Sequence, residues 1–350
     1  MKLLVILIGL CSICLSCRQK ADVSNAQYIK DLVETHKLIL PVDENTYYMS
    51  KSMFQFEEDN KEYLYFGNFQ KNQYEILIYD LENHNLYKRI PLLKEGPNGV
   101  PSISGCKPFE DSKTYFLFQH NIGRLSIIND KGELLCRYSV KLPEGQFTHC
   151  DDGWSYFYNP SFCVDSIVYF VHRLNKPQMK THEWKEVSMF TYLKLKSGEV
   201  GPVFLHYPSI FDKDVENPAG GYKFTYDYNY SQNRLVCSFT GYDSLMVSDD
   251  LQNVRWYNGK SRYMKSIRPA LEEASEGVQA LAKLKERGKY HNLMYDRYRD
   301  VYYRIAELPY EFKKDESPFD TPKGREFSII VFDKDFNIIG ETKFPGNKYF

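Results

Sequence analysis

The sequence predicts an all-β protein, and within that class a β-propeller built from four-stranded antiparallel blades. The first observation is that a unit of four short strands recurs five times, at roughly 40–50 residues per unit, which is the period of a propeller. The second is that middle strands such as Ile76-Leu77-Ile78 and Ile329-Ile330-Val331 are apolar on both faces. A blade buries both faces against its neighbours, so this composition fits. A β-sandwich would instead show alternating strands, with no reason for five matching units.

The first seventeen residues are expected to be a lipoprotein signal peptide. Lys2 precedes an apolar run from Leu3 to Leu15, which is shorter than the ~20 residues that span a bilayer as a helix. Leu15-Ser16-Cys17 then matches a bacterial lipobox, in which Cys17 becomes lipidated. The alternative is an ordinary secretory signal with a chance cysteine. A lipid anchor would hold the protein on a membrane surface without spanning it.

Residues 18–30 are predicted to form a polar tether, and residues 31–350 a single propeller domain. At the start of that domain Lys37 to Leu40 (KLIL) is an apolar run that could be a strand or a helix end.

The five units then follow in order, each with an inner strand, two middle strands and an outer strand. Turns between strands are rich in Asp, Asn, Ser and Gly, which tolerate the backbone angles of hairpins. The expected strands fall at 53–59, 63–69, 74–83 and 86–92; 105–111, 114–120, 123–132 and 134–140; 155–162, 167–173, 188–198 and 200–207; 225–231, 234–241, 244–253 and 254–258; 291–296, 301–308, 327–337 and 338–344.

Insertions interrupt this spacing. Residues 175–186 lengthen one loop of the third unit, and residues 309–325 add a polar loop to the fifth. Between the fourth and fifth units, Pro269 suits a first helical position and Gly288 a helix end, so one inserted helix is expected near 269–287.

Closure of the ring is left open by the sequence. Only PGNKYF follows the last unit, which is too short for another blade. Either the ring has five visible blades closed by a terminal strand such as KLIL, or a sixth blade is incomplete.

Three segments together resemble a known group of proteins: the lipobox, the EGPNGV loop at Glu95–Val100, and YDRYRDVYYR at Tyr295–Arg304. The chain resembles a domain-of-unknown-function family of Bacteroidetes-type lipoproteins with six-bladed, NHL/TolB-like propellers. The resemblance implies a six-bladed ring in the cell envelope, anchored to the outer membrane, and brings no established activity. In this group, acidic residues after the lipidated cysteine accompany surface export. The basic Arg18-Gln19-Lys20 therefore favours a periplasm-facing anchor over the cell surface.

Composition excludes some classes of function. The chain has 45 Lys and Arg against 46 Asp and Glu, which argues against nucleic acid as a partner. The eight His show no metal-ligand spacing, and nucleotide-binding, hydrolase and metalloprotease motifs are absent, so neither a metal nor a cofactor is expected.

After the signal peptide and Cys17, five cysteines remain without CxxC spacing. They are expected to be free thiols, although one disulfide would be possible.

Two clusters are candidate ligand sites. His149, Asp151, Asp152 and Trp154 precede the inner strand of the third unit, where loops line one mouth of the channel. The paired carboxylates could bind a cation, or they could accept hydrogen bonds from sugar hydroxyls while the indole stacks on the sugar ring. The alternative is a turn with a packed tryptophan.

The second cluster is Tyr295, Asp296, Arg297, Arg299 and Arg304 in the fifth unit. Arginine forks suit carboxylate or phosphate groups, and tyrosines add rigid amphipathic surface. The alternative is a charge-paired hairpin whose tyrosines fill blade interfaces. Arg304 needs a partner or an exit to solvent, because it lies within an aromatic strand.

These features favour a cell-envelope lipoprotein that binds a protein, peptide or glycan across one propeller face. The alternative is a carbohydrate-active hydrolase or lyase that uses carboxylates at the channel mouth, and no catalytic residue is assigned. A third possibility is a purely structural lipoprotein with a closed channel.

Overall fold

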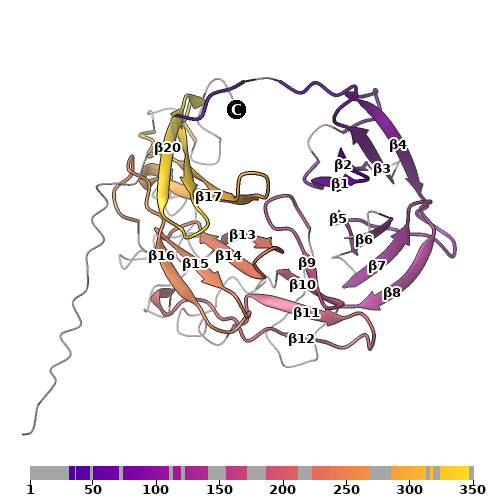
Figure 1. Ribbon diagram of the computed structural model, residues 1–350. Coiled ribbons are helices and arrows are strands. Elements are labelled where there is room, and N and C mark those ends of the chain that lie inside the picture. The colour runs from indigo at the N-terminus through magenta and orange to yellow at the C-terminus, as the bar shows by residue number, and fades with distance from the viewer. Residues whose placement is uncertain are drawn as a thin grey trace, which may run out of the picture.

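The protein forms a ring of five four-stranded sheets (Figure 1). The computed structural model describes residues 31–35, 37–47, 50–70, 74–109, 113–119, 123–140, 155–171, 187–211, 223–267, 282, 285–312, 316–317 and 324–346. Every sheet is antiparallel, with strands that follow one another in sequence from the centre of the ring to its rim. The predicted all-β propeller with five visible blades is therefore confirmed. The six-bladed ring that the resemblance implied is wrong, because the described residues form five blades.

The first two blades use eight strands. Blade one comprises β1 (Met53–Glu58), β2 (Lys61–Phe69), β3 (Tyr74–Asp80) and β4 (Asn85–Leu92). Blade two comprises β5 (Gly105–Pro108), β6 (Thr114–Gln119), β7 (Arg124–Asn129) and β8 (Leu134–Ser139).

The other three blades use twelve strands. Blade three comprises β9 (Phe162–Val164), β10 (Ile167–Val171), β11 (Phe190–Lys194) and β12 (Val200–Pro202), followed by a 3₁₀ turn, η4 (Ser209–Phe211). Blade four comprises β13 (Phe224–Asn229), β14 (Arg234–Phe239), β15 (Ser244–Ser248) and β16 (Arg255–Asn258). Blade five comprises β17 (Lys289–Asp296), β18 (Val301–Glu307), β19 (Phe327–Phe332) and β20 (Ile338–Phe344).

Short polar turns set the strand registers. The β1–β2 hairpin pairs Glu58 with Lys61, so its loop has two residues, Asp59 and Asn60, with φ values of 51° and 60°. Two consecutive positive φ angles match the twist of the flanking strands, and Asp and Asn tolerate them better than most residues. The β9–β10 turn repeats this geometry at Asp165 and Ser166.

Four hydrophobic clusters join the blades in pairs along the ring. They link blade one to two, two to three, three to four and four to five. Middle strands are buried on both faces, as the apolar runs predict: Ile76 and Leu77 on β3, and Ile330 on β19, are fully buried. A single blade leaves these faces in water, so the blades are stable only as neighbours.

The inner strand of blade three differs from the prediction. The expected strand at 155–162 is replaced by a tight turn, in which Tyr156 bridges to Asn159, and β9 begins only at Phe162. Pro160 has no N–H to donate to a ladder, which helps to explain why pairing starts after it. The wall of the channel in this blade therefore comes from a loop and a short strand.

Blade five and blade one meet at a seam, which residues 31–35 and 37–47 cross along the rim (Figure 1). We call these residues the N-terminal strap. Its Leu32 N–H donates to Thr342 Oγ1 of β20 at 2.8 Å, and its Tyr47 N–H donates to Asn68 Oδ1 of β2 at 3.0 Å. Between these ends, Leu40 packs on Phe66 and Leu77 of blade one.

The expectation that KLIL closes the ring as a strand is therefore wrong. Residues 37–40 pair with no strand, and Leu38 and Ile39 are exposed to 49% and 77%. The strap is held by Leu40, by separate hydrogen bonds and by the ion pair of Asp43 with Arg89 on β4.

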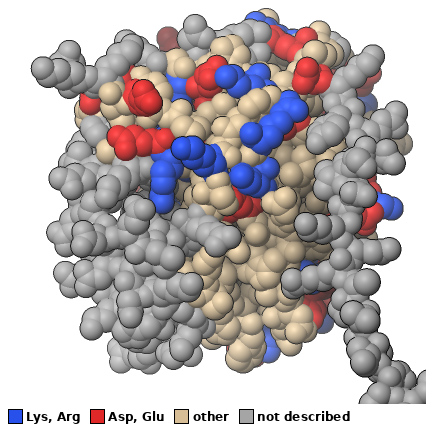
Figure 2. Space-filling model, turned by 90° about the vertical axis from the view of Figure 1, so that its left-hand side faces the viewer, with Lys and Arg blue, Asp and Glu red and all other residues tan. Residues whose placement is uncertain are grey.

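The predicted helix lies largely outside the described residues. Residues 282 and 285–287 are helical, and Gly288 follows them with φ of 81°, the conformation that favours glycine after a helix. In the part of the chain described here, no helix is long and apolar enough to cross a membrane. On the side of the molecule shown in Figure 2, lysine and arginine side chains lie among aspartate and glutamate, in keeping with the near-zero net charge.

Candidate functional site

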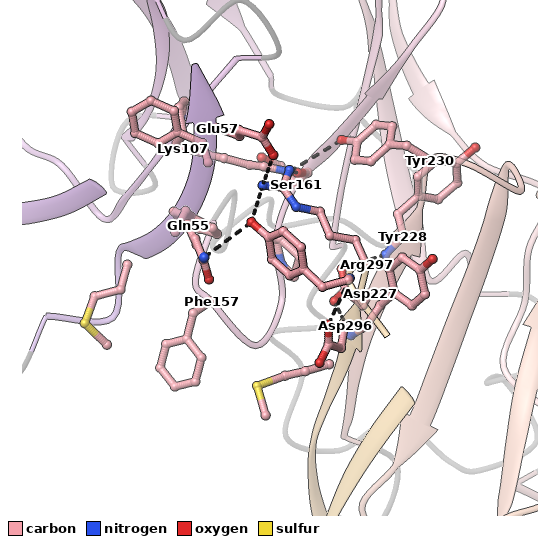
Figure 3. A pocket seen from close by; sticks show the side chains of 18 of the residues that line it. Gln55, Glu57, Lys107, Phe157, Ser161, Asp227, Tyr228, Tyr230, Asp296 and Arg297 are labelled. Carbon is pink, nitrogen blue, oxygen red and sulfur yellow. Dashed lines mark hydrogen bonds and ion pairs between the residues drawn. The ribbon is translucent and has the colours of Figure 1, made fainter. Parts of the chain in front are cut away.

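A cavity of about 1330 Å³ lies where the inner strands of the five blades converge. Every blade contributes at least one side chain to its wall, namely Gln55 of β1, Lys107 of β5, Ser161 in the loop before β9, Asp227 of β13 and Tyr295 of β17. Figure 3 shows several of these side chains directed toward the same space. The cavity is the channel of the propeller, and its chemistry depends on which residues the inner strands turn inward.

Asp227 lies at this wall because successive side chains of β13 point to opposite faces of the strand. Tyr226 and Tyr228 pack in the cluster between blades three and four, so Thr225 and Asp227 face the other way, toward β17. Thr225 Oγ1 donates to the His291 carbonyl at 2.9 Å and accepts the Leu293 N–H at 3.1 Å. These side chains satisfy the inner edge of β17, which has no further strand to pair with.

Asp227 is a carboxylate held between the protein and the cavity. Its oxygens accept the N–H groups of Tyr228 and Tyr295, each at 2.8 Å. Surrounding protein atoms desolvate the carboxylate and raise its pKa to about 6, although these two hydrogen bonds and the charge of Lys107 oppose the rise. The Asp227 carboxyl therefore takes up a proton more readily than an exposed aspartate does.

Lys107 reaches into the same cavity from β5. Its neighbours Cys106 and Pro108 are buried, and the pleat turns Lys107 to the opposite side. The ammonium donates to the Ser161 carbonyl at 2.5 Å and lies 3.5 Å from Tyr230 Oη. Its nitrogen is also 5.7 Å from the centre of the Tyr230 ring and 6.0 Å from that of Phe54.

The turn between β17 and β18 carries the arginines of the cavity. Arg299 pairs with Asp296 at 2.7 Å, and this contact helps to lower the pKa of Asp296, although burial of the carboxylate acts in the opposite direction. Arg297 reaches Glu57 on β1 at 3.5 Å, and Tyr298 Oη accepts a hydrogen bond from Gln55 Nε2 at 3.4 Å (Figure 3). The last blade thus contacts the first blade at the cavity.

The structure brings together four of the residues predicted as ligand-binding. Tyr295, Asp296, Arg297 and Arg299 all line the cavity. The charge pairing that was the alternative interpretation is also present, because Arg299 and Arg297 each contact a carboxylate.

The other cluster cannot be compared with the cavity. His149, Asp151, Asp152 and Trp154 lie outside the described residues, as does the predicted lipidation site Cys17.

Arg304 does not line the cavity, so its place in the predicted ligand cluster is corrected. Its side chain is fully buried between blades four and five. The guanidinium donates to Ser238 Oγ and to four backbone carbonyls, those of Phe239, Tyr242, Asp243 and Gly259, at 2.6–3.2 Å. Burial lowers its pKa to about 10, against the opposing influence of Tyr290 and Asp243. The residue thus has the partners that its buried position requires, and it supports the fold.

Sequence reasoning missed Lys107, Asp227, Gln55 and Glu57. Lys107, Asp227 and Gln55 each lie on an inner strand between two apolar neighbours, in the segments GCKP, TYDYN and MFQFEE. A polar residue between apolar ones is the signal that could have identified these three, because inner strands alternate between channel and interface. Glu57 is followed by Glu58 and carries no such signal.

The described residues contain no group of three or more His, Cys, Asp or Glu able to hold a metal ion. Cys106, Cys136, Cys163 and Cys237 are free thiols, and Cys150 lies outside the described residues.

Comparison with solved structures supports the fold. A member of the DUF4221 family from Bacteroides vulgatus is 50% identical, with a TM-score of 0.83, over 92% of this chain and 88% of that one. A second structure is that of a protein from Bacteroides fragilis described as exported. It is 9% identical, with a TM-score of 0.51, over 88% of this chain and 74% of that one. The second likeness shows the fold alone.

None of the curated proteins compared with the chain matches it significantly. A family model described as "Domain of unknown function (DUF4221)" matches residues 31–343, almost the whole propeller. The chain belongs to this family, DUF4221.

Proposed function

We propose that the protein is a lipid-anchored binding module of the cell envelope that takes part of a glycan, peptide or protein partner into its central cavity. The observation that carries this proposal is the cavity of about 1330 Å³ whose wall is shared by all five blades. A concave site with apolar walls and a few convergent polar groups is the usual form of a ligand pocket.

The composition of the wall suits recognition. Tyr228, Tyr230, Tyr295 and Tyr298 bring aromatic faces with polar tips to one space, and Tyr298 is exposed to 52%. Tyrosines offer rigid contact area together with hydrogen bonding. A ligand with flat or ring-shaped apolar faces and peripheral hydroxyl or amide groups would match them.

Binding can be tested on the mature protein purified from membranes in detergent. A panel of glycans and peptides is screened by thermal shift and titration calorimetry against the wild type, Tyr298→Ala and Tyr87→Ala. Tyr87 is a matched control, since it is an exposed tyrosine on the outer strand β4. Loss of at least ~tenfold in affinity for Tyr298→Ala alone is expected. Equal affinity for all three proteins would place the ligand elsewhere.

The anchor is proposed from the sequence of the first twenty residues. Leu15-Ser16-Cys17 ends the apolar run, the family resemblance implies the outer membrane, and Arg18-Gln19-Lys20 favours a propeller that faces the periplasm. Metabolic labelling with a palmitate analogue should mark the wild type and not Cys17→Ala. Labelling that persists in Cys17→Ala would remove the anchor from the proposal, and protease accessibility of intact cells would distinguish the two faces of the membrane.

A carbohydrate-active hydrolase or lyase is the second candidate. It is favoured by two carboxylates of the cavity whose pKa values move in opposite directions. Desolvation raises the pKa of Asp227 to about 6. The pKa of Asp296 is lowered, because burial is outweighed by the hydrogen bonds from Arg299 and the Tyr298 N–H taken together. The test is turnover of a glycan panel by the wild type and by Asp227→Asn. Absence of turnover, or turnover that survives the substitution, would reject Asp227 as the acid of such an enzyme.

A further inference from the structure

Among the described basic residues that line the cavity, Lys107 is the one without an ion pair. Among the described lining residues of the cavity, Glu57, Glu62, Asp227 and Asp296 are acidic, and Lys107, Arg297 and Arg299 are basic. Arg297 contacts Glu57, and Arg299 contacts Asp296. Lys107 forms no ion pair with any described carboxylate, although it lies near enough to Asp227 for its charge to act on that group.

The ammonium of Lys107 is held in place, and one of its donors has no partner among the described residues. It has three N–H groups, of which one is used by the Ser161 carbonyl and one is directed to the Tyr230 hydroxyl. Asp227 acts on this ammonium only from a distance, and a half-buried charge without a direct ion pair is unfavourable in a cavity that excludes part of the solvent. A negative group on a ligand would supply the missing partner at the remaining N–H.

Aromatic rings lie on two elements beside this ammonium. Phe54 belongs to β1 in blade one, and Tyr230 follows β13 in blade four, each within 6.0 Å of the Lys107 nitrogen. Figure 3 shows Lys107 extending toward Tyr230 with Ser161 beside it. A ring that carries the negative group could lie against these side chains while the group meets Lys107.

The surrounding carboxylates restrict the class of ligand. With four acidic side chains against three basic ones, a polyanion such as a polyphosphate would be repelled. Carboxylates do accept hydrogen bonds from hydroxyl groups. The site therefore suits a molecule with a single carboxylate and many hydroxyls.

From this arrangement we propose that Lys107, Phe54 and Tyr230 form a subsite for the carboxylated ring of an acidic saccharide, such as a uronic acid unit. The subsite rests on the proposed binding function and assigns the ligand class to the same cavity. Lys107 pairs with the sugar carboxylate, and the aromatic rings contact the apolar face of the sugar. Gln55 and Asp227 lie on the same wall and are the candidates to accept or donate hydrogen bonds to its hydroxyls.

Calorimetric titration of the detergent-purified mature protein tests the subsite. The probes are a galactotriose in which one residue is galacturonic acid, the neutral galactotriose and a short acidic peptide without sugar. The acidic sugar should bind the wild type roughly ten to a hundred times more tightly than the neutral one, the range expected for one charge-assisted hydrogen bond. This preference should weaken as salt is raised, because the pair is partly exposed.

Variants separate the subsite from general binding. Lys107→Met should remove the preference for the acidic sugar, so that the acidic and neutral sugars bind with similar affinity. Lys131→Met, on an exposed turn of the same blade, should bind like the wild type. Thermal unfolding of both variants checks that the propeller remains folded.

Three results would overturn the inference. Equal affinity for acidic and neutral sugars would remove the anion subsite while leaving the cavity as a binding site. Equal affinity for the acidic peptide would replace the sugar by a protein ligand. Absence of binding by any acidic saccharide, when another ligand of the panel still requires Tyr298, would reject the ligand class and keep the proposed function.

Discussion

Arg297 and Glu57 join the last blade to the first at the edge of the cavity, with 3.5 Å between guanidinium nitrogen and carboxylate oxygen. Their side chains are 47% and 43% exposed, so the pair contributes little to stability. Its position matters more than its energy. The pair holds a turn of blade five over β1 and neutralises a cation that would otherwise face a ligand.

Glu57→Gln is predicted to increase the affinity of the cavity for anionic ligands. The substitution leaves Arg297 without its carboxylate, so a second positive charge faces the cavity beside Lys107. A gain of a few-fold in affinity for the galactotriose with one galacturonic acid residue is expected, with a change of less than about 1 kcal/mol in the free energy of unfolding. Calorimetry and urea unfolding measure the two effects, and weaker binding of the acidic sugar would refute this arrangement of charges.

The strap across the seam is predicted to depend on Arg89. This residue lies 2.6 Å from the carboxylate of the buried Glu75 and 2.5 Å from that of Asp43 in the strap. Arg89→Met leaves Glu75 without this cation and releases Asp43, which should lower the free energy of unfolding by about 2 kcal/mol.

Lys88 provides the control for that measurement. It adjoins Arg89 on β4 and forms an exposed pair with Asp130 in blade two. Lys88→Met should change the free energy of unfolding by less than about 1 kcal/mol. If the two variants unfolded at the same urea concentration, the strap contacts of Arg89 would not contribute to closure.

Arg304 is predicted to be essential for folding rather than for binding. Its guanidinium carbon lies 3.4 Å from the centre of the Tyr290 ring, and its N–H groups satisfy four backbone carbonyls. Arg304→Met leaves these buried carbonyls without donors and should destabilise the protein by at least about 3 kcal/mol.

The exposed Arg255 on β16 serves as the comparison, because it pairs with Asp249 at the surface. Arg255→Met should change stability by less than about 1 kcal/mol. Arg304→Lys should be intermediate, since it keeps the charge but loses the planar fork. Urea unfolding gives the order, and an Arg304→Met protein as stable as the wild type would contradict the structural role.

Asp227 is predicted to make stability depend on pH between about 4 and 6. Desolvation raises its folded pKa from 3.8 to about 6, so in this interval the folded state binds more protons than the unfolded state. Stability from this group therefore falls as pH rises through the interval, by about 3 kcal/mol in total. Asp227→Asn should remove that part of the pH profile.

A second readout tests how close Lys107 lies to Asp227. The positive charge of Lys107 lowers the pKa of Asp227, in opposition to desolvation. In Lys107→Met the carboxyl resonance of Asp227 should therefore titrate at a higher pH in ¹³C NMR. An unchanged midpoint would show that the two groups do not interact in solution.

The repeated blades could be predicted from sequence because they depend on local patterns. Hairpin turns such as Asp59-Asn60 set the register, and two-sided apolar strands such as β3 indicate neighbours on both faces. The inner strand of blade three was misplaced because a local turn between Tyr156 and Asn159 replaces the first part of the ladder.

Ring closure could not be predicted, because it rests on contacts between distant residues. Leu32 and Thr342, which are 310 positions apart, meet at the seam, and no local pattern specifies that contact. The family resemblance implied six blades, whereas the described residues form five blades whose seam is crossed by the N-terminal strap.

Part of the candidate site could be predicted from local sequence, and the rest depends on contacts between distant blades. The crowded charges and tyrosines from Tyr295 to Arg299 stand out in the sequence, and they line the cavity. Arg304, in the same segment, faces the blade interface instead. Lys107 and Asp227 are single polar residues on apolar strands, and their meeting depends on how blades two and four are placed in the ring.

The most direct test of the binding cavity is a crystal structure of the protein grown with the tightest ligand of the glycan and peptide panel. The ligand is predicted to lie among the inner strands of the five blades, with an anionic group about 3 Å from the Lys107 ammonium and a ring beside Tyr230. A ligand bound on the outer rim, with the cavity unchanged, would contradict the account.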